Sequence, residues 1–180
     1  MLCIFCELLT ARLNSVIILE QKVPAAVLNG SEYVVLDCLY RLNPNKTEGL
    51  SVTWYFNNSP SLTYQWIPGF EVQTMGPLKS HILAGYKVNT DDELAKYRAV
   101  YIIRPTIELT GNYKCVVSTF YDEDFMIKKM TVYAPGQNLR MRRMKTVHRG
   151  QVNISCTISK VFPIPQIQMY IVVESNGTTN

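Results

Sequence analysis

The chain has 180 residues, of which 47% are hydrophobic and 18% are charged, with a formal net charge of +4. This composition excludes an intrinsically disordered chain and supplies apolar side chains for one complete domain core and part of a second. No run reaches the ~18 consecutive apolar residues of a membrane-spanning helix. We therefore expect any membrane anchor to lie beyond Asn180 or to be absent.

Residues 1–15 form an apolar segment that makes a poor signal peptide. It lacks a basic start and carries Glu7 inside its apolar run. Two interpretations are equally open, a degraded or misannotated signal segment and a disordered extension. We expect Cys3 and Cys6, which lie in this segment, to be unpaired.

Short alternating runs bounded by Gly, Pro, Asn and Asp follow, a pattern typical of an antiparallel β-sandwich. Residues 16–27 predict a first strand that is broken at Pro24, because proline cannot donate to a strand ladder. Further strands are expected at 33–40, 50–56, 62–67, 97–104, 113–120 and 125–133, with room for a short one within 69–81. The first domain is predicted to span residues 16–134.

Four residues in this span have the order and spacing of an immunoglobulin core. Cys38 lies 16 residues before Trp54 and 77 before Cys115, and Tyr113 stands two residues before Cys115. In that fold a disulfide joins strands B and F, the strand C tryptophan packs on it, and such a tyrosine makes a corner hydrogen bond. The spacing therefore predicts an all-β, variable-type immunoglobulin-like sandwich with a Cys38–Cys115 disulfide, long enough to include strands C′ and C″.

Residues 135–180 predict a linker and a partial second immunoglobulin-like domain. The run from Gln151 to Cys156 repeats the strand B pattern, and Tyr170 stands 14 residues later, at the position of the strand C aromatic residue. No later cysteine exists to pair with Cys156, and the 44 residues 137–180 are too few for the ~100 of this fold. We expect a truncated second domain; a natural tail with one free thiol is the alternative.

The cysteines and the sequons together predict an extracellular protein, either secreted or tethered at the plasma membrane. Structural disulfides persist in oxidising compartments. Five Asn-x-Ser/Thr sequons predict a glycoprotein with acceptors at Asn29, Asn45, Asn57, Asn153 and Asn176. Chance matches are the alternative for each single sequon, and Pro60 directly follows the third.

Several short motifs go beyond this shared framework. They are Val23-Pro24, Gly30, Leu36-Asp37-Cys38-Leu39-Tyr40, Val52-Thr53-Trp54-Tyr55, Tyr64-Gln65-Trp66 with Pro68, and Tyr113-Lys114-Cys115-Val116-Val117-Ser118. With them, residues 16–134 resemble the variable-like domain of the insect beaten path family of neuronal immunoglobulin proteins. The resemblance implies a role in neuronal adhesion or axon guidance, with another immunoglobulin-superfamily surface protein as partner.

Three expectations concern charged groups. Leu109 stands where variable domains carry an aspartate, so their salt bridge to an arginine near strand D is not expected. Asp37 should face solvent because it neighbours the inward-facing Cys38 on a strand. The cluster of Asp122, Glu123 and Asp124 is interpreted as a solvated hairpin turn, because a calcium site needs roughly 6–8 oxygen ligands.

The sequence favours binding over catalysis. Only His81 and His148 are present, and neither lies near a Gly-x-Ser-x-Gly, His-Glu-x-x-His or Cys-x-x-Cys motif. We expect no enzymatic activity, no cofactor, no metal site and no small-molecule substrate. An extracellular location also argues against a nucleic-acid partner.

A protein-binding face is predicted on the sheet of strands G, F, C and C′. The outward positions are Tyr55, Val116, Ser118 and Phe120, with Tyr64 or Trp66 added by the register of strand C′. Tyr and Trp are enriched at interface hot spots, which favours docking to another protein. Ordinary exposed tyrosines, with Trp66 buried under the C′ edge, are the alternative.

A second candidate contact is the basic tract 140–149. It contains five of the 18 Lys and Arg residues, at Arg140, Arg142, Arg143, Lys145 and Arg149. Concentrated positive charge attracts polyanions, so a glycan-binding or humoral immune module that binds heparan-type chains is the alternative function. A solvated strand of the second domain, with Met141, Met144 and Val147 partly inward, is the favoured interpretation.

Overall fold

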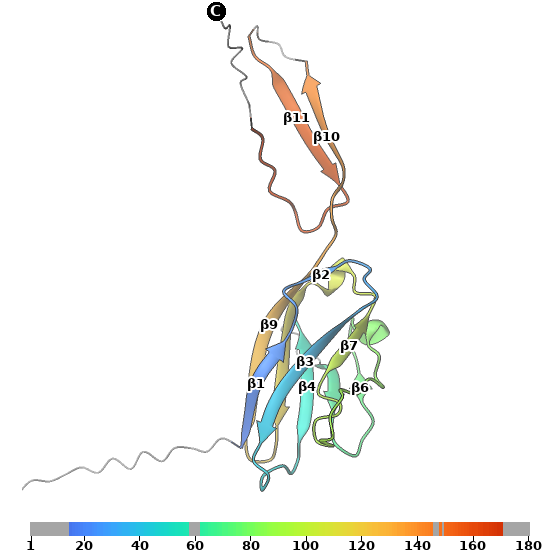
Figure 1. Ribbon diagram of the computed structural model, residues 1–180, viewed down its shortest axis with the longest axis vertical. Helices are drawn as coiled ribbons and strands as arrows, with labels where there is room; N and C mark the ends of the chain where they lie inside the picture. Colours follow the sequence, from blue (N-terminus) through green and yellow to red (C-terminus); the bar gives the residue numbers. More distant parts are fainter. Residues whose placement is uncertain (1–14, 58–61, 146–147, 149, 171–180) are drawn as a thin grey trace, which may run out of the picture. The chain divides into compact units, whose positions relative to one another are not determined.

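The computed structural model describes residues 15–57, 62–145, 148 and 150–170 (Figure 1). They belong to two compact units, unit 1 (Met1–Val132) and unit 2 (Tyr133–Asn180). The predictions about a signal segment and about Cys3 and Cys6 lie outside the described residues. Among those described, no helix has the length and apolar character needed to cross a membrane.

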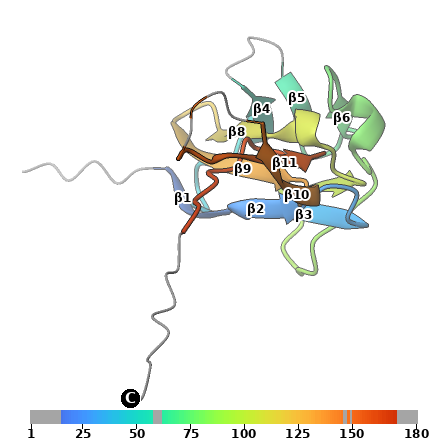
Figure 2. The same cartoon turned by 90° about the horizontal axis from the view of Figure 1, so that it is seen from above.

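Unit 1 consists of two sheets. The three-stranded sheet has the order β1 (Val16–Lys22), β3 (Tyr33–Leu42), β7 (Val100–Ile103). The six-stranded sheet has the order β2 (Ala26–Leu28), β9 (Glu123–Tyr133), β8 (Gly111–Ser118), β4 (Ser51–Phe56), β5 (Leu62–Trp66), β6 (Gln73–Thr74). Figure 2 shows β3 in one layer and β4 and β8 in the other. Two short 3-10 helices, η1 (Lys79–His81) and η2 (Ile107–Leu109), lie in the connections.

The predicted break at Pro24 is where the chain passes from one sheet to the other. Before it, β1 pairs with β3; after it, β2 lies beside β9 in the six-stranded sheet. The carbonyl of Ala25 already accepts a hydrogen bond from the amide of Thr131 at 3.0 Å. Proline has no amide to donate, so it interrupts the first ladder at the point where the strand changes partner.

The inner faces of both sheets bury one hydrophobic core around the predicted disulfide. Cys38 and Cys115 are bonded, and both are fully buried. Trp54 lies opposite Cys115 in the β4–β8 register and is 1% exposed. The Tyr113 hydroxyl donates to the carbonyl of Leu109 at 2.7 Å, which is the corner hydrogen bond that the sequence predicts.

No full strand D exists among the described residues; only an isolated bridge joins Ile82 to Ile102. Aromatic donors from the sheets hold the irregular segment that leads into β7. Each donates a hydrogen bond to a backbone carbonyl of that segment. The Tyr40 hydroxyl donates to Leu94, the Tyr64 hydroxyl to Tyr97 at 2.7 Å, and the Trp54 indole to Arg98 at 3.2 Å. Burial raises the pKa of both phenols above the ordinary value, so these hydroxyls remain protonated donors.

Unit 2 contains an antiparallel ribbon of β10 (Gln137–Met144) and β11 (Asn153–Ser159). Every residue of β10 is exposed. Cys156, on β11, is a free and half-buried thiol. The assignment of unit 2 as part of a second immunoglobulin-like domain stays a prediction.

Candidate interaction face

The side of the six-stranded sheet that faces away from the core is here called the outer face. Strand side chains alternate between faces, so the register defines its membership. Val116 is paired with Thr53 on β4 and with Phe125 on β9, and Lys114 is paired with Tyr55 and Ile127. The rows on β4, β8 and β9 are Ser51, Thr53 and Tyr55; Asn112, Lys114, Val116 and Ser118; and Glu123, Phe125, Ile127 and Lys129.

Part of the predicted contact set lies on or beside this face. Tyr55 and Ser118 are half-buried members of it, and Ser118 shares a 2.9 Å hydroxyl hydrogen bond with Ser51. Phe120 follows β8 in the turn and is 81% exposed. Val116 is on the outer face but only 8% exposed, because it lies in the middle of the sheet between Thr53 and Phe125.

The prediction that Tyr64 or Trp66 adds to this face is wrong. The register sets Tyr64 opposite Trp54 and Trp66 opposite Val52, and both partners point into the core. Tyr64 is accordingly 1% exposed and Trp66 is 3% exposed. Because the two residues are separated by one position on the same strand, one register buries both.

The two most exposed apolar residues of the outer face were not among the residues predicted from the sequence. Phe125 is 54% exposed and Ile127 is 46% exposed, and both lie on β9. The sequence shows that these residues belong to one face of a strand, since Phe125, Ile127 and Lys129 alternate with Met126, Lys128 and Met130. Alternation alone does not say which set faces inward; the pairing of Met130 with Gly111 and the burial of Met130 decide it.

Lysines and one glutamate surround this apolar patch. The Lys114 ammonium lies over the Phe125 ring, 4.3 Å from its centroid, in a cation–π contact. Lys129 and Glu123 are exposed at opposite ends of the β9 row. The outer face therefore combines an exposed aliphatic and aromatic centre with charged ends, as protein interfaces do.

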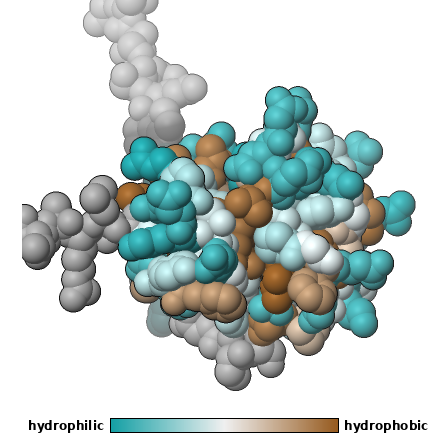
Figure 3. Space-filling view, turned by 90° about the horizontal axis from the view of Figure 1, so that it is seen from below, coloured by the Kyte–Doolittle hydropathy of each residue, from teal (hydrophilic) through white to brown (hydrophobic). Residues whose placement is uncertain are grey.

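The β3–β4 and β8–β9 loops meet at one end of unit 1. Phe120 donates its amide to the carbonyl of Glu48 at 2.9 Å. Gly49 has φ +70, and a Cβ there would lie 2.2 Å from the Phe120 ring, so glycine is required under this side chain. Figure 3 looks onto this end, where hydrophobic side chains form patches separated by hydrophilic ones.

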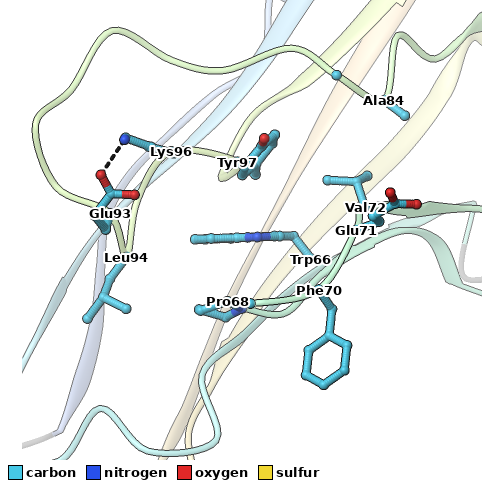
Figure 4. Close-up of a pocket in the computed structure, with 12 residues that line it drawn as sticks. Trp66, Pro68, Phe70, Glu71, Val72, Ala84, Glu93, Leu94, Lys96 and Tyr97 are labelled. Atoms are coloured by element: carbon cyan, nitrogen blue, oxygen red, sulfur yellow. Dashed lines mark hydrogen bonds and ion pairs between the residues drawn. The ribbon is translucent and has the colours of Figure 1, made fainter.

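Trp66 lines a separate cleft rather than the outer face. The cleft has a volume of about 590 Å³ and lies between the segment after β5 and residues 84–97. Figure 4 shows Trp66 between Pro68 and Tyr97, with Phe70 pointing away from the indole. The Trp66 and Tyr97 rings are 5.5 Å apart and tilted, so the indole is mainly part of the packing.

The acidic turn is a hydrogen-bonded clamp and not merely a solvated hairpin. A carboxylate oxygen of Asp122 accepts a hydrogen bond from the amide of Ser15 at 2.8 Å. A carboxylate oxygen of Asp124 accepts a hydrogen bond from the amide of Ile18 at 2.7 Å. Ser15 is buried and begins the described chain, and Ile18 belongs to β1. These two carboxylates therefore fasten the first strand of one sheet to the hairpin of the other.

Replacing Asp122 with asparagine is expected to reduce the loss of thermal stability in acid. The amide of Ser15 holds the Asp122 pKa below its ordinary 3.8, so this carboxylate stabilises the fold above pH 3.8. That contribution is lost as the pH falls through the lower, folded-state pKa. Melting temperatures from about pH 7 to about pH 2 should fall less in Asp122→Asn than in the unmodified chain. The control is Asp91→Asn, at an exposed aspartate. If the melting temperature falls equally with pH in all three proteins, the Asp122 carboxylate does not stabilise the fold through Ser15.

Asp37 does not face solvent as predicted. Its carboxylate accepts two hydrogen bonds from Arg98, at 2.8 and 3.1 Å, and the two side chains are 17% and 18% exposed. Leu109, at the position where a variable domain carries aspartate, is buried in the core. The arginine near β7 is thus paired with a carboxylate on β3.

The β10 strand separates the basic tract into two faces. Alternation puts Arg140 and Arg142 on one side of the ribbon and Arg143 on the other, where Lys145 follows. The four described cations are exposed. Arg149, along with Val147, lies outside the described residues. Met141 is 71% exposed and Met144 51% exposed, so the inward placement predicted for them is not found.

The described sequon asparagines are all exposed: Asn29, Asn45, Asn57 and Asn153. None of the four lies within a strand row of the outer face, but Asn57 directly follows the β4 row and is hydrogen-bonded to Asn112 of the β8 row. Asn57 has φ 53 and its side-chain oxygen accepts from the amide of Asn112 at 2.9 Å, so it also shapes the turn after β4. Asn176 lies outside the described residues, and glycosylation stays a prediction at all five positions.

The alignment with a solved butyrophilin structure agrees with the fold. No family model and no curated protein sequence matches the chain. The solved structure of bovine butyrophilin aligns with a TM-score of 0.55 and 24% identity, over 80% of this chain and 66% of that one. A human B7-H4 IgV-like domain aligns with a TM-score of 0.47 (14% identity, 67% and 96% covered). An amphioxus IgVJ-C2 molecule aligns with 0.49 (12% identity, 76% and 72% covered).

The sheet order, the disulfide and the butyrophilin alignment together establish an all-β immunoglobulin-like sandwich with the additional β5 and β6 strands of a variable-type domain. The chain spans about two thirds of the butyrophilin chain. None of these comparisons supports the beaten path resemblance, which stays a prediction.

Proposed function

We propose that the protein is an extracellular recognition module that binds another cell-surface protein through the outer face. The observation that carries the proposal is the exposed pair Phe125 and Ile127 on β9, with the half-buried Tyr55 two strands away on β4, on a sheet whose other side faces the core. Exposed aromatic and aliphatic side chains that cluster on one face mark interaction sites more often than single exposed residues do. A disulfide-bonded fold suits an oxidising, extracellular compartment.

The chemistry of the face supports docking over catalysis. Its rows offer hydroxyls, the two separate aromatic side chains Tyr55 and Phe125, aliphatic carbons and lysines, and no nucleophile with an adjacent base. A role in axon guidance rests on the family resemblance alone, since fold does not fix function. The glycan-binding alternative gains no support, because the ribbon divides the basic tract between two faces.

The test is a screen of the full chain, displayed as a multimer, against a panel of extracellular domains that includes the chain itself. Binding to any partner should weaken by tenfold or more in Phe125→Ser, as expected for an interface hot spot. The control is Tyr33→Ser, at a 50% exposed tyrosine on the opposite sheet. Binding that is equally sensitive to both variants, or to neither, would overturn the proposal, provided melting shows that both fold.

A further inference from the structure

The exposed row on β9 has a self-complementary order of side chains. It reads Glu123, Phe125, Ile127, Lys129, with an acid at one end, a base at the other and two apolar residues between them. All four are exposed. Within the described part of the chain, the structure gives neither Glu123 nor Lys129 an ion-pair partner. The row therefore leaves two opposite charges available, about 20 Å apart at ~3.3 Å per residue.

A two-fold axis through the middle of this row matches it to itself. If a second copy lies face to face with β9 running the opposite way, Glu123 of one copy meets Lys129 of the other. The same operation sets Phe125 against Ile127. With the two strands running the same way, like charges would meet, which is unfavourable. The order of the row thus selects one orientation.

The neighbouring β8 row is compatible with this arrangement. Val116 and Ser118 carry no charge, and the Lys114 ammonium is already placed over the Phe125 ring of its own chain. Among the described sequon asparagines, Asn57 borders this face, because its side-chain oxygen accepts a hydrogen bond from the amide of Asn112, which is paired with Lys129 on β9.

We infer that the outer face binds a second copy of this chain, as an antiparallel two-fold dimer with reciprocal Glu123–Lys129 ion pairs around a Phe125–Ile127 centre. This inference rests on the proposed docking role of the outer face and names the partner. Each dimer contains two such ion pairs, related by the symmetry axis.

The test is a charge exchange followed by analytical ultracentrifugation of the full chain over a range of concentrations. Free thiols are alkylated without reduction, so that only non-covalent dimers are counted. Glu123→Lys and Lys129→Glu should each weaken dimerisation about tenfold, because each replaces two attractions with two repulsions. The double variant restores opposite charges and should return to within about twofold of the unmodified chain. Glu32→Lys and Lys79→Glu, at exposed positions outside the outer face, are controls for net charge.

A chain that stays monomeric, or a double variant as weak as the single ones, overturns the inference. Neither result decides the proposed function. If a different surface protein still binds and Phe125→Ser still removes that binding, the outer face is a docking site for another partner. If Phe125→Ser affects no binding at all, the docking role itself fails.

Discussion

Replacing Cys38 and Cys115 together with alanine is expected to lower the free energy of unfolding of unit 1 by about 4.5 kcal/mol, from the entropy of a 77-residue loop. The two sulfurs also fill space at the centre of the core, beside Trp54. Since small domains have total stabilities of roughly 5–15 kcal/mol, the variant should be at best marginally folded. Urea denaturation followed by tryptophan fluorescence measures the loss.

Cys156→Ala is the matched control for the disulfide experiment. It removes the free thiol of unit 2 and leaves the unit 1 disulfide in place, so the unfolding of unit 1 should be unchanged. A loss of under about 1 kcal/mol in the double-alanine variant would mean that the packed sheets hold together without the bond.

Arg98→Ala is expected to destabilise unit 1 by about 3 kcal/mol, because it leaves the largely buried Asp37 carboxylate without its cationic partner. The variant keeps the backbone carbonyl of residue 98, which accepts a hydrogen bond from the Trp54 indole. Removal of both charges should cost less than the sum of the single substitutions, since no unpaired ion remains. Urea titrations of Arg98→Ala, Asp37→Ala and the double variant measure this coupling.

Lys96→Ala provides the comparison for the buried pair. Its ion pair with Glu93 is exposed, with side chains 30% and 77% accessible, and surface pairs contribute about 0–1 kcal/mol. Strictly additive losses for Asp37 and Arg98, or a loss at Arg98 no larger than at Lys96, would argue against a structural role for the Asp37–Arg98 pair.

The outer face shows how far strand patterns predict a site. The alternation of side chains along β4 correctly predicted that Tyr55 points outward and Trp54 points inward. It left the orientation of Tyr64 and Trp66 open, because the register of β5 depends on pairing with β4 and not on its own sequence. The outward orientation of Phe125 and Ile127 likewise depends on the β8–β9 register and not on the sequence of β9 alone.

The sequence by itself determined the fold class, the disulfide, the tyrosine corner and the break at Pro24. These features depend on spacings along the chain and on the chemistry of single residues, such as two thiols, one phenol and a proline without an amide. Only the tertiary structure decided that Asp37 is paired with Arg98, that Asp122 and Asp124 hold β1, and which aromatic residues remain exposed. Those outcomes depend on contacts between residues up to 107 positions apart, and a one-residue change of register would alter them without changing the local pattern.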